Sequence, residues 1–365
     1  MQSSFTQRFP HLFDTESSVN RAADKSSPIA SLPTPVGSLP ELGEQAFVKY
    51  DNLTHPEYGG NKIRKLDWIA ADIRKNKARH VITFGAIGTN AGVATAMMCQ
   101  RLGVRCSIYL FDQPLSNTVY ANIKRMQGYG AELIYCGSLF NTMLRFYSSV
   151  YRLKPYCYFL WAGCSNPPAI LAYVDAAFEL QQQVQQGLIP EPKKIVIPVG
   201  SGSSAAGLYL GLQLTGLSSE LIPVRVAPSK LGPFDACSDA IINRQIKTGA
   251  ELLKLGSRST PRSTPQPLPH SLPQSKLNHD YYGEGYGHAD EQVKHAISTF
   301  AQSGIQLEGT YSGKAACAFL DCLKRSSGPV LFWNTYNSSA YIPEPAISVL
   351  PNALKKKLEA SELLS

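Results

Sequence analysis

The sequence lacks the features of a membrane, secreted or metal-binding protein. No apolar run approaches the length that spans a bilayer, and the first residues lack the hydrophobic segment of a secretory signal. The eight cysteines form no C-x-x-C pair and no set of ligands spaced with histidine, so we expect no metal site and no disulfide framework. These absences favour a cytoplasmic protein whose cysteines are small core residues.

Charge is also sparse. Only 17% of the residues are charged, and the net charge is +8. The basic residues are scattered, apart from short runs such as residues 355–357, and no basic stripe alternates with aromatic residues. This pattern permits small anionic ligands, but it predicts neither a nucleic-acid partner nor a membrane partner. A chain of 365 residues with 44% hydrophobic residues is long enough for two domains, or for one domain with an insertion.

Short apolar strands alternate with helical segments along most of the chain. We expect strands at 46–50, 80–84, 105–110, 132–135, 156–160, 194–198, 221–226 and 330–333. We expect helices at 62–75, 90–102, 116–129 and 168–185, from a glycine-rich turn to about 214, and between Asp290 and Gly304. This alternation predicts an α/β protein with parallel sheets flanked by helices.

Two segments depart from the alternation. Residues 1–26 are polar and rich in serine, and we expect a loose lead-in there; Asp14 and Glu16 argue against a transit peptide. Residues 257–275 combine prolines and hydroxyls that cannot build a core, which predicts a mobile surface insertion. A docking peptide in the polyproline II conformation is the alternative for this insertion.

The stretch from Gly59 to Leu66 has the strongest chemical content. Two glycines allow a tight passage of the backbone, and Asn61 suits an N-cap. Lys62 and Lys65 then share one face at the positive end of a helix, which suits an anion that carries an aldehyde or a phosphate. From spacing alone, the alternative is a solvated basic first turn.

This stretch, Gly-Gly-Asn-Lys-Ile-Arg-Lys-Leu, resembles the pattern G-G-N-K-x-R-K-L of one enzyme family. The pattern carries the Schiff-base lysine of the pyridoxal-phosphate enzymes that include aminocyclopropane-carboxylate deaminases and D-cysteine desulfhydrases. The resemblance covers residues 44–340 without the proline-rich insertion, and it implies pyridoxal 5'-phosphate as cofactor. Lys62 is then the lysine that joins the cofactor, and Lys65 lies near its phosphate.

The resemblance also implies the architecture of a fold type II enzyme related to the tryptophan synthase β chain. Two domains are expected, each with a parallel-rich open sheet flanked by helices and with the cofactor in the cleft between them. The larger domain would comprise residues 27–65 and 176–365, and the smaller one residues 66–175. The family is commonly dimeric, so a homodimer is expected.

A second glycine-rich turn follows the predicted strand at 194–198. Its small residues let the backbone close around a phosphate at a helix N-terminus. A dinucleotide site fits poorly because Glu220 precedes the next strand, whereas the fingerprint needs an acid after it. A purely structural turn is the other alternative. By the resemblance, the phosphate contacts fall on Gly200, Ser201, Gly202, Ser203, Ser204 and Ala205.

Thr89 and Asn90 follow the strand at 80–84, where one of them could simply cap the next helix. By the resemblance, Thr89 binds the substrate carboxylate and Asn90 contacts the phenolic oxygen of the cofactor. The family pattern is Gln-Ser-Asn-His, whereas this chain has glycine at position 88 and alanine at position 91. That departure leaves the usual substrates of the family open.

Tyr286 and Tyr311 lie in runs that resemble the family motifs G-x-G-Y-G and V-Y-x-G-K, and they would flank the substrate. Ordinary core tyrosines are the alternative. The run that ends at Lys314 is not a P-loop, because its two glycines are too close and Ala315 replaces the hydroxyl residue.

Ser312 and Thr335 are the last two candidate site residues. By the resemblance, they lie on the ring-nitrogen side of the cofactor. The deaminases carry a glutamate where this chain has Ser312, and a hydroxyl cannot hold the ring nitrogen protonated as a carboxylate can. Thr335 matches the threonine of H-T-G-G, but Tyr336 and Asn337 replace the two glycines, so a more crowded pocket is expected.

These residues predict a pyridoxal-phosphate-dependent lyase that acts on a small amino acid by α,β-elimination. D-cysteine desulfhydrase-like activity, which yields pyruvate, ammonia and sulfide, is favoured over aminocyclopropane-carboxylate deamination because Ser312 makes the ring a weaker electron sink. A protein that binds the cofactor without turnover is the alternative from another class.

Overall fold

The computed structural model describes residues 4–12, 28–231, 234–255, 271–337, 339–343 and 350–360. The chain divides into two compact units. The larger unit comprises Met1–Trp68 with Pro167–Ser338, and the smaller unit comprises Ile69–Asn166 with Ser339–Ser365. The boundary falls inside the helix α2 (Asn61–Lys75), whose first half therefore belongs to the larger unit.

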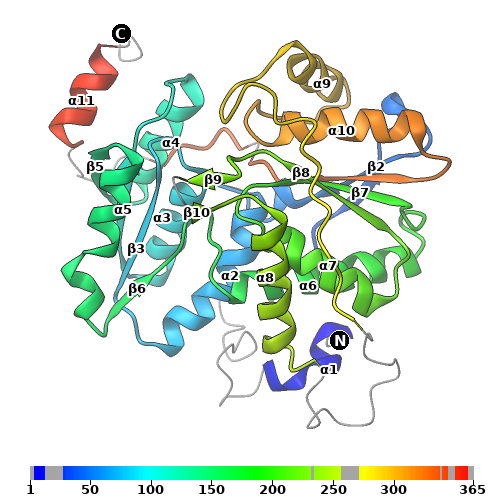
Figure 1. Cartoon of the computed structure of the whole chain (residues 1–365), viewed down its shortest axis with the longest axis horizontal. Coiled ribbons are helices and arrows are strands. Elements are labelled where there is room, and N and C mark those ends of the chain that lie inside the picture. Colours follow the sequence, from blue (N-terminus) through cyan, green and yellow to red (C-terminus); the bar gives the residue numbers. More distant parts are fainter. Residues whose placement is uncertain are drawn as a thin grey trace. The chain divides into compact units, whose positions relative to one another are not determined.

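The larger unit is built on a five-stranded sheet. Its strands are β1 (Val36–Ser38), β2 (Ala46–Tyr50), β11 (Val330–Asn334), β7 (Lys194–Val199) and β8 (Glu220–Arg225), in that order. All neighbours are parallel except the edge pair β1 and β2. One face is covered by α6 (Pro168–Gln185), α7 (Ser203–Thr215) and α8 (Asp239–Leu252), and the other by α9 (Glu291–Gln302) and α10 (Ser312–Arg325) (Figure 1).

Alternation along the central strand explains this layering. In β7, Ile195, Ile197 and Val199 belong to the core under α6 and α7, whereas Val196 belongs to the core on the side of α9 and α10. Successive side chains of a strand point to opposite faces, so a strand covered on both faces reads as a continuous apolar run. The sequence showed such runs, and the predicted fold class is confirmed.

The smaller unit holds a four-stranded parallel sheet in the order β5 (Glu132–Gly137), β4 (Arg105–Phe111), β3 (His80–Ala86) and β6 (Cys157–Phe159). The helices α3 (Asn90–Leu102) and α4 (Asn117–Gly128) lie on the face to which Ile108 points. The helix α5 (Leu139–Tyr147) covers the other face, where its Phe146 packs against Phe84 and Tyr109.

The remaining elements are short. They are α1 (Ser4–Arg8), η1 (Pro10–Leu12), η3 (Pro40–Leu42), η4 (Asp51–Leu53), η5 (Val150–Leu153), β9 (Lys230–Leu231), β10 (Phe234–Asp235) and α11 (Asn352–Glu359). Among the described residues, no helix combines the length and the apolar character needed to cross a membrane.

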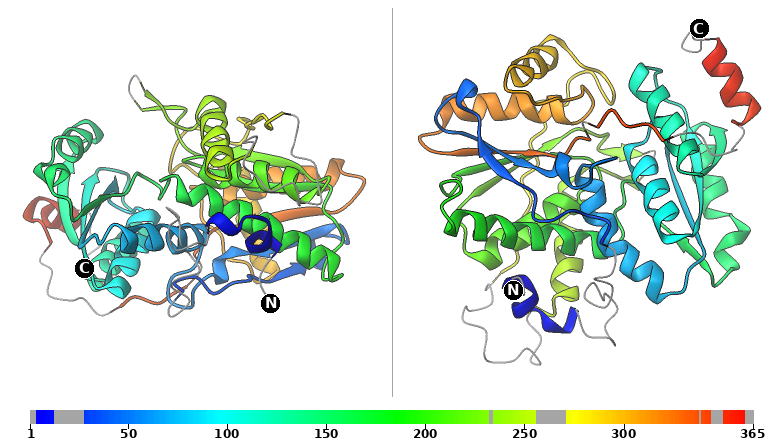
Figure 2. Two further views of the ribbon diagram at one scale, coloured as in Figure 1. Left: turned by 90° about the horizontal axis from the view of Figure 1, so that it is seen from below. Right: turned by 180° about the vertical axis from the view of Figure 1, so that it is seen from behind.

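The expectation of a loose N-terminal lead-in is wrong for residues 4–12. Phe5, Phe9 and Leu12 are buried in the core of the larger unit. The ring of Phe5 packs edge-on against Trp68 and Phe178, so α1 lies against α6 (Figure 2). Three apolar residues in a polar segment are enough to anchor it, because each buried aromatic ring removes a large apolar area from water. Residues 13–27 lie outside the described part of the chain.

The C-terminal segment also departs from the predicted boundaries. Residues 339–365 group with the smaller unit, whereas the sequence analysis assigned them to the larger domain. Polar contacts hold this segment to the smaller unit. The Arg125 guanidinium donates to the carbonyl oxygens of Ser339 and Tyr341 at 2.9 and 3.0 Å, and Lys357 pairs with Asp112 at 2.8 Å. Most of the predicted insertion at 257–275 lies outside the described residues, which resume at 271.

Candidate functional site

The carboxyl ends of three parallel strands meet at one edge of the larger sheet. Asn334 of β11 pairs with Tyr50 of β2, and two residues earlier Phe332 pairs with Val196 of β7. The chain continues from β2 into the segment that carries Lys62, from β11 into Thr335, and from β7 into Gly200. Ligands of open α/β sheets bind outside the carboxyl ends of the strands, so this edge is the candidate site.

Two glycines carry the chain from β2 to the start of α2. A Cβ atom on Gly59 would lie 1.8 Å from the carbonyl oxygen of Asn52, so a larger residue cannot enter without moving backbone. Gly60 has a φ of 100° and donates its N–H to the carbonyl oxygen of Asp51 at 2.8 Å. The Thr54 hydroxyl donates to the Gly60 carbonyl oxygen at 2.9 Å. The backbone is therefore held on both sides of Gly60.

The segment after β11 clamps the same passage. The Asn61 N–H donates to the carbonyl oxygen of Thr335 at 3.1 Å, and the Gly59 N–H donates to Oδ1 of Asn337 at 3.0 Å. The Asn337 side chain thus supports the backbone that leads into α2, a role that the sequence analysis did not foresee. Thr335 reaches this passage through its main chain.

The two lysines lie in the first turns of α2. Lys62 is half-buried, and its Nζ donates to Oδ1 of Asn61 at 3.1 Å. Lys65 is 2% exposed, so the alternative of a fully solvated basic turn is wrong for this residue. Asn61 is the first helical residue, whereas the sequence analysis expected it to be the N-cap.

The start of α7 has the properties of an anion site. Its N-cap is Gly202, which has a φ of 87° and no side chain that could cap the helix. The Ser203 hydroxyl is fully buried, yet it has no hydrogen-bond partner among the described residues. Gln245 supports the turn by donating from Nε2 to the carbonyl oxygen of Ser201 at 2.9 Å. A buried hydroxyl without a partner at a helix N-terminus fits the phosphate of pyridoxal 5'-phosphate.

Tyr286 and Tyr311 form a pair in the larger unit. Their hydroxyl oxygens are 2.8 Å apart, and their rings are perpendicular. Burial raises the pKa of Tyr286 and raises that of Tyr311 well above its usual value, so both phenols keep their protons at neutral pH. The Tyr311 ring also lies against the turn that precedes α7, because a Cβ on Gly200 would be 3.2 Å from it.

Lys314 holds the turn that presents Tyr286. Its Nζ donates to the carbonyl oxygens of Tyr282 and Gly285, at 2.5 and 2.6 Å, and the side chain is 1% exposed. Burial lowers the pKa of Lys314. Sequence reasoning gave this lysine no role; its place in the V-Y-x-G-K resemblance was the available signal.

Ser312 begins α10 and is tied to Glu308. The Glu308 N–H donates to the Ser312 hydroxyl at 2.8 Å, and the Ser312 N–H donates to the Glu308 carboxylate at 2.9 Å. The same carboxylate accepts from the Tyr311 N–H at 2.7 Å. Glu308 is therefore the acid that satisfies the free N–H groups of this helix end, in the manner of a capping box.

Thr89 and Asn90 lie in the smaller unit. Thr89 is the N-cap of α3, and its hydroxyl accepts from the Gly92 N–H at 3.1 Å. A hydroxyl that accepts one hydrogen bond can still donate its own proton. The Asn90 side-chain oxygen accepts from Nδ2 of Asn122 at 2.9 Å, and the same nitrogen donates to the Gly88 carbonyl oxygen. The capping role considered for Thr89 is therefore present, and Asn122 orients the Asn90 amide.

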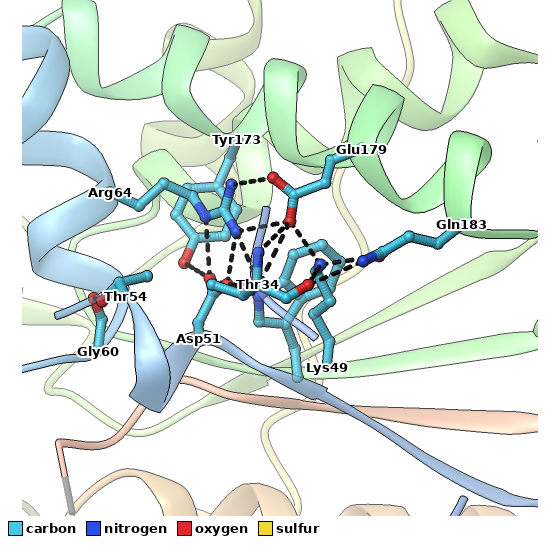
Figure 3. Close-up of polar contacts among 10 residues, drawn as sticks. Thr34, Lys49, Asp51, Thr54, Gly60, Arg64, Tyr173, Glu179 and Gln183 are labelled. Atoms are coloured by element: carbon cyan, nitrogen blue, oxygen red, sulfur yellow. Dashed lines mark hydrogen bonds and ion pairs between the residues drawn. The ribbon is translucent and has the colours of Figure 1, made fainter. Parts of the chain in front are cut away.

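Sequence reasoning missed a buried ionic network beside the site (Figure 3). The Asp51 carboxylate accepts hydrogen bonds from the Arg64 guanidinium at 2.8 Å, from the Tyr173 hydroxyl at 2.7 Å and from the Trp333 indole at 2.7 Å. The Glu179 carboxylate pairs with Arg64 at 3.0 Å and with Lys49 at 2.5 Å. The available signals were an acid directly after an apolar strand and the arginine of G-G-N-K-x-R-K-L.

Acid should weaken the larger unit through Glu179. Although burial alone would raise it, Arg64 and Lys49 lower the pKa of Glu179 from 4.5 to about 2. A carboxylate with a lowered folded pKa stabilises the native state above its unfolded pKa, and that contribution is lost as the pH falls through the folded pKa. The loss therefore runs from about pH 4.5 down to about pH 2 and amounts to roughly 3 kcal/mol.

Urea titrations of the wild type and of Glu179→Gln, repeated over this pH range, measure this contribution. The free energy of unfolding should fall more steeply with acid in the wild type, because the variant has no carboxylate to protonate at this position. Identical slopes for both proteins would contradict the assignment.

Comparisons with known proteins bear on the family and on the fold of this chain. The family described as "Pyridoxal-phosphate dependent enzyme" matches residues 29–335. The D-cysteine desulfhydrase of Klebsiella pneumoniae (strain 342) is 29% identical over 331 residues, which cover 84% of this chain and 92% of that protein. A crystal structure of an ACC deaminase homologue has a TM-score of 0.72 at 23% identity and covers 96% of this chain and 99% of that one. A pyridoxal 5'-phosphate-dependent aspartate racemase has a TM-score of 0.57 at 18% identity, covering 86% and 93%.

Proposed function

This chain belongs to the pyridoxal-phosphate dependent enzyme family, and we propose that it is a lyase that acts on a small amino acid by α,β-elimination. D-cysteine is the proposed substrate, and pyruvate, ammonia and hydrogen sulfide are the products after addition of one water. The relative named D-cysteine desulfhydrase, similar along nearly its whole length, supports this choice.

The observation that carries the proposal is the unpartnered, buried Ser203 hydroxyl at the start of α7, at the same sheet edge as the segment that carries Lys62. We propose that Ser201 to Ala205 hold the phosphate together with Lys65, and that Lys62 holds the aldehyde. Asn90 is the proposed contact of the phenolic oxygen, and Thr335 lies on the side of the ring nitrogen. When bound, pyridoxal 5'-phosphate supplies an electrophilic aldehyde and an electron sink.

The remaining roles fall to side chains of this chain. The Lys62 amine is the proposed base that removes the Cα proton, since a lysine near other cations in a desolvated site is easier to deprotonate. The Thr89 hydroxyl would bind the substrate carboxylate. Tyr286 and Tyr311 are both protonated at neutral pH, and one phenol donates its proton to the other, so the second would donate a hydrogen bond to the substrate.

Ser312 supports elimination over cyclopropane opening. Its hydroxyl is an acceptor for the Glu308 N–H, and the Glu308 carboxylate beside it is occupied by the N–H groups of Tyr311 and Ser312. Without a free carboxylate to keep the ring nitrogen protonated, less charge can be stabilised at Cα. A substrate that expels a β-leaving group quickly is favoured under this condition.

A panel of substrates tests the proposal. The purified protein is loaded with pyridoxal 5'-phosphate and incubated with D-cysteine, L-cysteine, D-serine and 1-aminocyclopropane-1-carboxylate. We expect sulfide and pyruvate in equal amounts from D-cysteine, and little 2-oxobutanoate from the cyclopropane substrate. Predominant 2-oxobutanoate would show a deaminase, and bound cofactor without any product would show a binding protein.

We also propose a homodimer in the cytoplasm, where the eight cysteines remain free thiols. Its support is an apolar stripe in the smaller unit, formed by Phe140, Leu144 and Tyr147 on α5 and by Val150 and Leu153 on η5. These side chains are 49 to 86% exposed. No acidic residue occurs from 133 to 156, and Arg152 stacks on Tyr147 at 5.3 Å. Exposed aromatic and arginine side chains without acids are typical of the core of a protein interface.

The mass in solution checks this assembly. Sedimentation of the wild type should give twice the 39.8 kDa of the chain, and the double variant Phe140→Glu with Leu153→Glu should give a monomer, because buried charges break an apolar interface. Leu188→Glu is the matched control, since Leu188 is 58% exposed in the larger unit. A dimer that survives the double variant would place the interface elsewhere.

A further inference from the structure

Arg64 is a charged residue of the stretch around Lys62, and the proposed chemistry gives it no role. Its side chain is completely buried, and its guanidinium donates to Asp51, Glu179 and Thr34 at 2.8 to 3.3 Å. Figure 3 shows the guanidinium lying between the two carboxylates. Burial alone would lower the pKa of Arg64, but the two carboxylates raise it well above its usual value. The arginine is therefore always charged.

Stability alone explains such a network poorly. Removing charges from water costs about as much as their mutual attraction returns, so a buried ion pair adds little net stability compared with apolar residues of the same size. What a planar, bidentate fork does provide is a fixed geometry. The network joins α2 through Arg64, the end of β2 through Asp51, and β11 through Trp333.

The main chain on both sides of Lys62 is bound to one residue, Asp51. Two positions before it, the Gly60 N–H donates to the main-chain oxygen of Asp51 at 2.8 Å. Two positions after it, Arg64 binds the Asp51 carboxylate through Nε and Nη2. The main chain of Lys62 is thus tied on both sides to Asp51, which is in turn fixed by Tyr173 and Trp333.

We infer that Arg64 and Asp51 are positioning residues for Lys62, and that their network aims its amine at the cofactor aldehyde. This inference rests on the proposed attachment of the cofactor to Lys62. It explains why an arginine with five donors in a fixed plane stands at this position, since a lysine can supply charge but cannot bridge two carboxylates in one plane.

The rate of cofactor attachment tests the inference. Cofactor-free protein is mixed with pyridoxal 5'-phosphate, quenched with borohydride at successive times and digested, and the pyridoxyl group on Lys62 is counted by mass spectrometry. Arg64→Lys and Asp51→Asn should slow attachment by about 10- to 100-fold, because a misplacement of about 1 Å costs up to about 100-fold. Both replacements are close in size to the native side chain, which limits the loss of packing.

Lys49→Met is the matched control. Lys49 is as buried as Arg64 and bonds Glu179, Gln183 and Thr34, but it forms no hydrogen bond with Asp51 or Arg64. This variant should attach the cofactor within about twofold of the wild-type rate, because Arg64 keeps both hydrogen bonds with Asp51 and the amine of Lys62 is not displaced. All proteins are compared well below the unfolding midpoint of their cofactor-free forms.

The outcomes separate the inference from the proposed function. Failure to trap the cofactor on Lys62 in the wild type overturns the proposed function. If trapping succeeds in the wild type but Arg64→Lys and Asp51→Asn attach as fast as Lys49→Met, the network is merely structural and the inference is wrong. Slow attachment in these two variants, with the control unaffected, supports the inference.

Discussion

Replacing Lys62 with alanine should abolish turnover and the visible absorbance of the bound cofactor. The lysine is proposed both to hold the aldehyde and to move the Cα proton, and proton transfer by a positioned side chain is alone worth about 10²- to 10⁴-fold. We therefore expect kcat to fall by at least about 1,000-fold, measured as pyruvate formation at saturating substrate and cofactor.

Lys65→Ala is the companion variant. Lys65 lies in the same helix and is buried, but it is proposed to bind the phosphate. Its replacement should raise the Kd for the cofactor by about tenfold, the loss of one charge-assisted hydrogen bond, while the absorbance returns at high cofactor concentration. Loss of the absorbance in Lys65→Ala and its retention in Lys62→Ala would exchange the two roles.

Asp51→Ala should lower the free energy of unfolding by about 3–5 kcal/mol, the cost of breaking a buried ion pair by removal of one partner. The Asp51 carboxylate accepts hydrogen bonds from Arg64, Tyr173 and Trp333, and all three donors are buried. Alanine leaves Tyr173 and Trp333 without this acceptor and leaves Glu179 as the only carboxylate bound to Arg64 among the described residues. Urea titration of the cofactor-free protein at neutral pH measures the loss.

Asp290→Ala provides the reference for this measurement. Asp290 caps α9 by accepting from the Val293 N–H at 2.9 Å, and loss of such a cap costs about 1 kcal/mol. If Asp51→Ala costs no more than Asp290→Ala, the donors around Asp51 must find other acceptors, and the network is less rigid than its geometry indicates.

The layered fold was predictable because its signals are local. Each central strand is a short apolar run, and glycine-rich turns mark the junctions that follow β2 and β7. Several features escaped this reading. The helix α1 depends on three apolar residues in a polar segment, and no helix was predicted where α5, α8 and α10 lie. Composition outweighs such sparse patterns when a segment is read without its tertiary partners.

The chemistry-bearing residues were predictable as candidates, but their supporting contacts were not. Asp51 meets Arg64 across 13 residues, Tyr173 across 122 and Trp333 across 282. Periodicity is informative over a few turns of helix or strand and cannot report pairs this far apart. The Gly59 N–H likewise finds the Asn337 side chain 278 residues away. The sequence therefore predicts candidate reactive groups, whereas the contacts that position these groups follow only from the fold.

The burial of Phe5 has a practical consequence for anyone who shortens or tags this protein. A shortened protein that starts at residue 28 would expose the rings of Trp68 and Phe178 to water, and so leave an apolar surface on α6 and on α2, the helix that carries Lys62. Aggregation of such a shortened protein would then reflect this exposed surface and not the behaviour of the full-length enzyme.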